Sequence, residues 1–134
     1  MSKDTFWALI QEAKTACGQD MDAITEHLRD GLLIMGTGAA RQFHNIFQAY
    51  MDLAEPFGLW DAASIIKENG CTLEGFIDFR AWLIAQGKAV YLNALRDPDT
   101  LADVEPYGDC SFESIAYVGN DVYHNLTGQD AYGD

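Results

Sequence analysis

A chain of 134 residues, 49 % of them apolar and 12 % aromatic, can bury the core of one domain without disulfide or metal staples. It has no signal-peptide pattern and no apolar run near the roughly 18 residues that span a bilayer, so we expect a cytoplasmic protein with no membrane partner. The net charge of −13 argues against nucleic-acid binding, because affinity for phosphates comes mostly from cations.

Apolar residues recur every three or four positions and nowhere alternate for long, which predicts an all-α fold. The first helix is expected at about 4–16, ending at Gly18, and a second follows the cap candidate Asp20. Three glycines make the stretch GLLIMGTGA a helix end and a turn. The third helix is expected at about 40–54, where apolar side chains form one stripe.

The second half of the chain is expected to hold shorter helices. A short helix LWDAASIIK follows a break at Pro56, and the next, GFIDFRAWLIAQGK, continues into 88–96 past a bend at Gly87. A last helix is expected at 112–126. These elements predict a single all-α domain over residues 1–128, an irregular, orthogonal bundle of about seven helices, with a frayed tail at 129–134.

The core of this bundle is predicted from the apolar stripes of the expected helices. Its members are Phe6, Ile10, Phe43, Phe47, Tyr50, Leu59, Phe76, Leu83, Ile115 and Val122.

The acidic residues are unevenly distributed. Residues 1–96 contain twelve Asp or Glu against eight Lys or Arg, whereas residues 97–134 contain nine acids and no Lys or Arg. A negative field over this last quarter favours a basic protein partner. The candidate partner-binding residues are the acids that come first in it: Asp97, Asp99, Asp103, Glu105 and Asp109.

Several stretches together resemble a bacterial family catalogued as domain of unknown function number 4240. They are DTFWALIQEA at 4–13, LWDAASII at 59–66, GCTLEGFIDFRAWLIAQGKAVY at 70–91, DPDTLAD at 97–103 and AYVGNDVYHNLTG at 116–128. The resemblance implies a small, helical, cytosolic bacterial protein. It implies no activity, cofactor or catalytic residue.

One arginine, Arg80, lies within the apolar face of its expected helix, on an arc of about 140°. A buried guanidinium needs a carboxylate or several carbonyls, and Glu12 and Glu113 are the best candidate partners. The alternative is an arginine that lines a pocket for a small anionic ligand. In that case Trp82 and Gln86, on the same helix, are candidate ligand-binding residues.

No metal, cofactor or catalytic constellation is recognised. The three histidines, His27, His44 and His124, lack metal-ligand spacing and are expected to face solvent or lie at the edge of an apolar stripe. The three cysteines are far apart, which predicts reduced thiols rather than disulfides or zinc ligands.

Three functions stay open on these grounds. We expect a protein-interaction module, resembling an immunity protein that neutralises a basic toxin or a nucleic-acid mimic. The alternatives are a regulatory or accessory domain that binds a small anion near Arg80, and an enzyme whose site the sequence does not reveal. The oligomeric state is not predicted.

Overall fold

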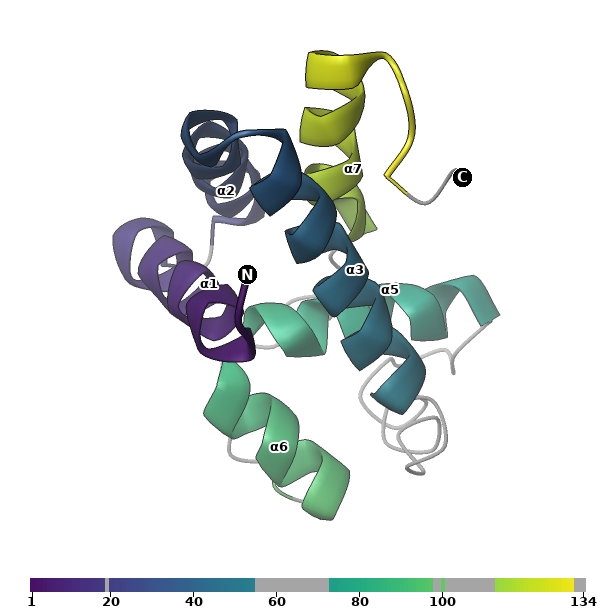
Figure 1. The fold of residues 1–134 in the computed structure, drawn as a ribbon. Helices are drawn as coiled ribbons and strands as arrows, with labels where there is room; N and C mark the ends of the chain where they lie inside the picture. The colour runs from purple at the N-terminus through teal and green to yellow at the C-terminus, as the bar shows by residue number, and fades with distance from the viewer. Residues whose placement is uncertain (19, 55–72, 98–99, 101–112, 132–134) are drawn as a thin grey trace. The chain divides into compact units, whose positions relative to one another are not determined.

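The computed structural model describes residues 1–18, 20–54, 73–97, 100 and 113–131. Within these ranges the chain forms six α-helices and no strand, which confirms the all-α prediction. The helices are α1 (Lys3–Cys17), α2 (Met21–Met35), α3 (Thr37–Ala54), α5 (Leu73–Ala85), α6 (Lys88–Arg96) and α7 (Glu113–Thr127) (Figure 1). The short helix predicted at 59–67 lies outside the described residues.

Side-chain caps start the first two helices. Ser2 Oγ accepts a hydrogen bond from the Thr5 amide at 3.1 Å, and Asp20 Oδ1 accepts one from the Ala23 amide at 3.0 Å. These bonds satisfy amides that the first helical turn leaves without partners. The predicted cap at Asp20 is therefore confirmed.

The boundary between α2 and α3 corrects the predicted turn. α2 continues to Met35, and α3 begins at Thr37 rather than near residue 40. Gly36 alone separates them, with φ of 100°, and its amide donates to the Leu32 carbonyl at 2.9 Å. One glycine is enough because it adopts positive φ without steric cost, whereas Gly31 stays helical inside α2.

Backbone contacts divide the chain into two compact units, residues 1–49 with 114–134, and residues 50–113. α3 crosses the boundary, so its last turn belongs to the second unit. The prediction of one domain over residues 1–128 stays a prediction.

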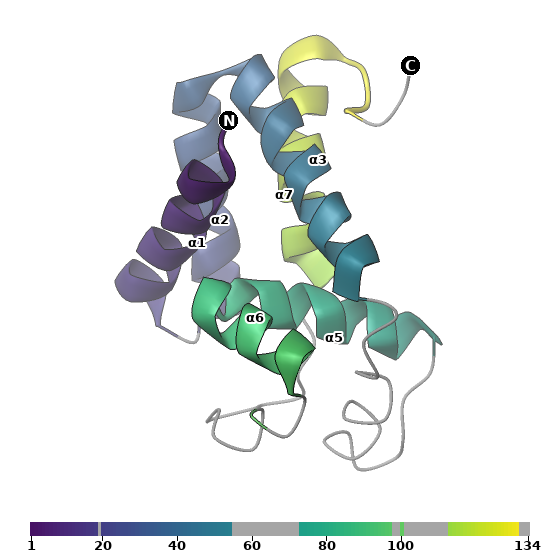
Figure 2. The same cartoon turned by 60° about the horizontal axis from the view of Figure 1, so that its bottom comes forward.

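An aromatic cluster fills the first unit. Phe6 of α1 lies 5.1 Å from Trp7 between ring centroids, 4.9 Å from Phe43 and 6.2 Å from Phe47. α2 runs beside α1 in both views (Figures 1 and 2) and buries Ile24, Leu28 and Leu32. Burial of side chains of this size contributes about 1.5–3 kcal/mol each.

The second unit is built on α5. Every residue from Phe79 to Gly87 is buried, and Phe79 stacks on Trp82 with ring centroids 5.6 Å apart. α6 packs against α5 after a break at Gly87, where φ is 106°. The predicted bend between these helices is thus a change of helix.

The predicted core agrees with the observed burial. Eight of its ten members are buried, Tyr50 is half-buried, and Leu59 lies outside the described residues.

Residues 129–131, the described part of the tail that was predicted to fray, make hydrogen bonds to α7. The Asn120 side chain accepts a hydrogen bond from the Ala131 amide at 2.6 Å, and Thr127 Oγ1 accepts one from the Gln129 amide at 3.1 Å. Ala131 is buried because these bonds fold the segment back onto α7.

Candidate functional site

Arg80 lies in the most buried stretch of the described chain. The apolar run around it, IDFRAWLIA, is long enough for a helix to be covered on all sides, and α5 is buried without interruption from Phe79 onwards. A polar side chain there cannot reach bulk water easily. It must find its partners within the protein.

The Arg80 guanidinium caps the carboxyl end of α3. Its Nη1 donates a hydrogen bond to the Met51 carbonyl at 2.7 Å, and its Cζ lies 4.7 Å from the centre of the Phe76 ring. Met51 belongs to the last turn of α3, where carbonyls lack intrahelical partners and the helix dipole is negative. The last turn of α3 contains no basic residue of its own, so α5 supplies the cation.

The expectation of a buried Arg80 bonded across helices is confirmed, since the residue is 7 % exposed. Among the described residues, the acceptor is the Met51 carbonyl. Glu12 instead lies 3.1 Å from His27 Nε2, and the Glu113 side chain is outside what the structure describes. Arg80 Nε is buried and has no hydrogen-bond partner among the described residues.

A second donor reaches the same turn of α3. Tyr91 of α6 donates its hydroxyl proton to the Tyr50 carbonyl at 2.7 Å, and the two rings meet edge to face with centroids 5.3 Å apart. Burial, and then the neighbouring Tyr50, raise the pKa of Tyr91 well above its usual value, against a smaller lowering by Arg80. The phenol therefore stays protonated and remains a donor. α5 and α6 both hold the end of α3.

The other two candidate ligand-binding residues do not join Arg80 in one site. Trp82 is buried against Phe79, and because it follows Arg80 by two positions, the two side chains leave α5 in nearly opposite directions. The Gln86 amide donates back to the Trp82 carbonyl at 3.2 Å. These contacts fix the helix itself, so the described residues form no ligand site from the three.

Asp97 is exposed at the end of α6, while the other candidate partner-binding residues lie outside the described ranges. These are Asp99, Asp103, Glu105 and Asp109. The Asp97 carbonyl accepts hydrogen bonds from the Thr100 amide at 3.0 Å and from the Thr100 hydroxyl at 2.8 Å.

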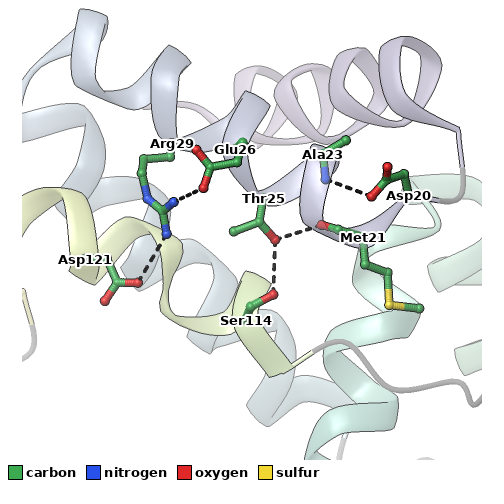
Figure 3. Close-up of polar contacts among 8 residues, drawn as sticks. All are labelled: Asp20, Met21, Ala23, Thr25, Glu26, Arg29, Ser114 and Asp121. Carbon is green, nitrogen blue, oxygen red and sulfur yellow. Dashed lines mark hydrogen bonds and ion pairs between the residues drawn. The ribbon is translucent and has the colours of Figure 1, made fainter.

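The acidic C-terminal part also contributes to a polar contact between α2 and α7 (Figure 3). Thr25 Oγ1 donates to the Met21 carbonyl at 3.0 Å and lies 3.1 Å from Ser114 Oγ. Arg29 pairs with Glu26 and reaches Asp121 of α7 at 3.9 Å. Sequence analysis missed this contact. The only signal for it was Thr25 on the apolar side of α2.

His44 corrects the prediction that all three histidines face solvent or a stripe edge, because only 3 % of it is exposed. Gly119 of α7 is the reason. A Cβ at that position would lie 2.9 Å from Ala40 O, His44 N and His44 Cβ, so glycine lets α7 approach α3 closely enough to cover the imidazole. Burial lowers the pKa of His44, and the Asp121 carboxylate partly opposes this shift.

The other two histidines agree with the prediction. His27 is partly exposed beside Glu12, and His124 is exposed with its Nδ1 3.3 Å from Asp130. Among the described residues, no group of three His, Cys, Asp or Glu side chains could hold a metal ion. None of the described helices is both long and apolar enough to cross a membrane.

The model of a family described as "Protein of unknown function (DUF4240)" matches residues 1–125. No curated protein and no solved structure matches the chain.

Proposed function

The chain belongs to this family, and because its description names no activity, we propose from the residues themselves that the protein is an interaction module for a basic protein partner. The observation that carries this proposal is the distribution of charge. Residues 97–134 contain nine acids and no Lys or Arg. Acids so placed repel one another, and a cationic partner relieves that repulsion.

The exposure of the described acids supports the proposal. Asp97, Asp121 and Asp130 are all exposed. Asp121 makes a 3.9 Å contact with Arg29, and Asp130 makes a 3.3 Å contact with His124. Surface ion pairs of this kind contribute little to stability, and a cationic partner can still interact with these carboxylates. A module that neutralises a basic toxin or imitates a nucleic acid would present such a surface.

The test compares two variants that lose the same charge. One replaces Asp97, Asp99 and Asp103 by Asn, and the control replaces Asp4 and Asp52 by Asn and Glu12 by Gln. Proteins retained from a lysate of the source organism are quantified at low and high salt. We expect wild type and control to retain the same basic proteins at low salt and to release them at high salt. The variant of Asp97, Asp99 and Asp103 should fail to retain them at low salt. Identical partners for all three proteins, held equally at both salt concentrations, would end the proposal.

A second candidate function, binding of a small anion at Arg80, is favoured by one observation. The Nε of Arg80 is buried without an acceptor among the described residues. Calorimetric titration with inorganic phosphate tests it, with Arg80→Met as the comparison and Arg96→Met as the control. Heat of binding in wild type and the control that disappears in Arg80→Met is expected if an anion completes the guanidinium. Absence of binding heat in all three proteins would contradict anion binding, and the role of Arg80 would then be to cap the carboxyl end of α3.

A further inference from the structure

One face of α2 is not covered by any described residue. Its buried residues Ile24, Leu28 and Leu32 lie on one side. On the opposite side, Asp22, Glu26, Asp30 and Ile34 follow each other at intervals of four residues and are all exposed. Residues four apart are neighbours on a helix surface, offset by about 40°, so these four form a continuous ridge about 18 Å long. We call it the α2 ridge.

The isoleucine at the end of the ridge is the unusual member. Ile34 is 88 % exposed, the largest exposure among the large apolar side chains of the described chain, and Met35 beside it is 46 % exposed. Neither local propensity nor packing within the described chain accounts for an isoleucine there. A side chain of this size gains about 1.5–3 kcal/mol when a partner covers it.

The acids of the ridge are also not explained by the stability of α2. Asp22 lies in the first turn, where the helix dipole favours it, and Glu26 pairs with Arg29 (Figure 3). Asp30 lies in the carboxyl half, where the dipole disfavours an acid, and the last turn contains no basic residue. No ion pair joins Asp22 or Asp30 to another described residue.

Charge decides what could cover the ridge. A second copy meeting through the same face would bring three acids against three acids, because a two-fold contact pairs a surface with itself. An anionic lipid surface would be repelled in the same way. A segment with cations spaced to meet the acids and an apolar residue to cover Ile34 is complementary to both features.

We propose that the α2 ridge is the docking surface for a basic helix of the protein partner that carries an apolar residue on the same face as its cations. The inference rests on the proposed function and specifies the surface that binds the partner and the kind of segment that it binds. Cations at intervals of four residues would lie along Asp22, Glu26 and Asp30, and an apolar side chain would pack on Ile34 and Met35. The acids set the rate of encounter and its salt dependence, whereas the isoleucine sets how long the complex lasts.

The test uses two synthetic helical peptides of equal charge. One carries three Lys residues four positions apart and a Leu four positions beyond them on the same face, and in the other Ser replaces that Leu. Fluorescence anisotropy measures their affinity for wild type, Ile34→Ser and the control Leu92→Ser. Leu92 is a 44 % exposed leucine of α6. We expect Ile34→Ser to weaken binding of the Leu peptide about tenfold and to leave the affinity for the Ser peptide unchanged. Leu92→Ser should bind both peptides with the affinity of wild type.

Amide chemical shifts in NMR spectra provide the second measurement. Addition of the Leu peptide should shift amides of residues 22–35. Salt-dependent binding that shifts amide resonances outside residues 22–35 would overturn the docking proposal and leave the proposed function standing. Equal effects of Ile34→Ser and Leu92→Ser on affinity would do the same. Absence of salt-dependent binding of either peptide to wild type would contradict both. A dimer in sedimentation that Ile34→Ser abolishes would assign the ridge to a second copy and overturn the proposal.

Discussion

α5 and the open face of α2 differ in which kind of residue they bury and expose. α5 buries a charged side chain, whereas the open face of α2 exposes a large apolar one. From Phe79 onwards every residue of α5 is buried, so its arginine must find acceptors inside the protein and bonds the Met51 carbonyl. α2 is covered on one side only, so its acids can stay in water and its unusual residue is an exposed isoleucine. A buried charge in a covered helix has a structural explanation close by, whereas an exposed apolar residue on an open face has none within the described chain.

The largest difference between the two regions is expected from truncating one aliphatic side chain in each. Leu83→Ala in α5 removes a fully buried side chain and should lower the free energy of unfolding by about 2–5 kcal/mol. Ile34→Ala in α2 should change it by no more than about 0.5 kcal/mol. Urea unfolding of both variants measures this. Similar losses would mean that Ile34 is covered in solution.

A pair of glycine substitutions compares a covered helix with α2 itself. Gly119→Ala places a methyl group 2.9 Å from backbone atoms of α3, and overpacking of this kind should destabilise the protein by about 1–3 kcal/mol. Gly31→Ala in α2 meets nothing within 4 Å and should stabilise by about 0.5–1 kcal/mol through helix propensity. Thermal unfolding should shift the two midpoints in opposite directions. Shifts of the same sign would refute the close approach of α3 and α7.

Replacing Arg80 tests whether a carbonyl is the principal acceptor for its charge. Arg80→Met leaves the Met51 carbonyl without this donor, which should cost about 1–3 kcal/mol of unfolding free energy. Arg96→Met, at an exposed site, should stay within about 0.5 kcal/mol. A loss of about 3–5 kcal/mol in urea unfolding of Arg80→Met would instead indicate that the guanidinium neutralises a buried carboxylate.

The smallest effect is expected at His44 and depends on pH. Because burial lowers the pKa of His44 in the folded state, its contribution to stability is complete above the usual imidazole pKa of about 6.5 and is lost as the pH falls below it. The slope attributable to this group is at most about 1.4 kcal/mol per pH unit. Unfolding of wild type and His44→Gln between pH 8 and 5 should give curves that converge in acid. Parallel curves would show that His44 does not titrate differently on folding.

Local patterns were sufficient for the helices themselves. The three- and four-residue recurrence of apolar side chains predicted helices within a few residues of the observed ends, and the cap at Asp20 was recognised because its side chain acts on an amide three residues away. The turn over GLLIMGTGA was wrong because three glycines look alike in sequence. Only Gly36 adopts the positive φ that ends α2.

Contacts between helices could not be predicted in the same way. That Arg80 would be buried followed from its place in an apolar face, but its acceptor is a backbone carbonyl, and every residue of any sequence has one. Burial of His44 depends on Gly119, a residue 75 positions away that reads as an ordinary helical glycine. The hydrogen bond of the Ala131 amide depends on Asn120 in the same manner.

The sequence alone determined the all-α fold, most of the core and the acidic character of residues 97–134, because periodicity, apolar content and charge are properties of the chain itself. The tertiary structure decided that Arg80 caps α3 and that His44 is buried. It also decided that Ile34 is exposed, at the end of a row of three exposed acids on α2. These depend on which helix faces are covered. Coverage arises from contacts between residues distant in sequence, and no local pattern encodes it.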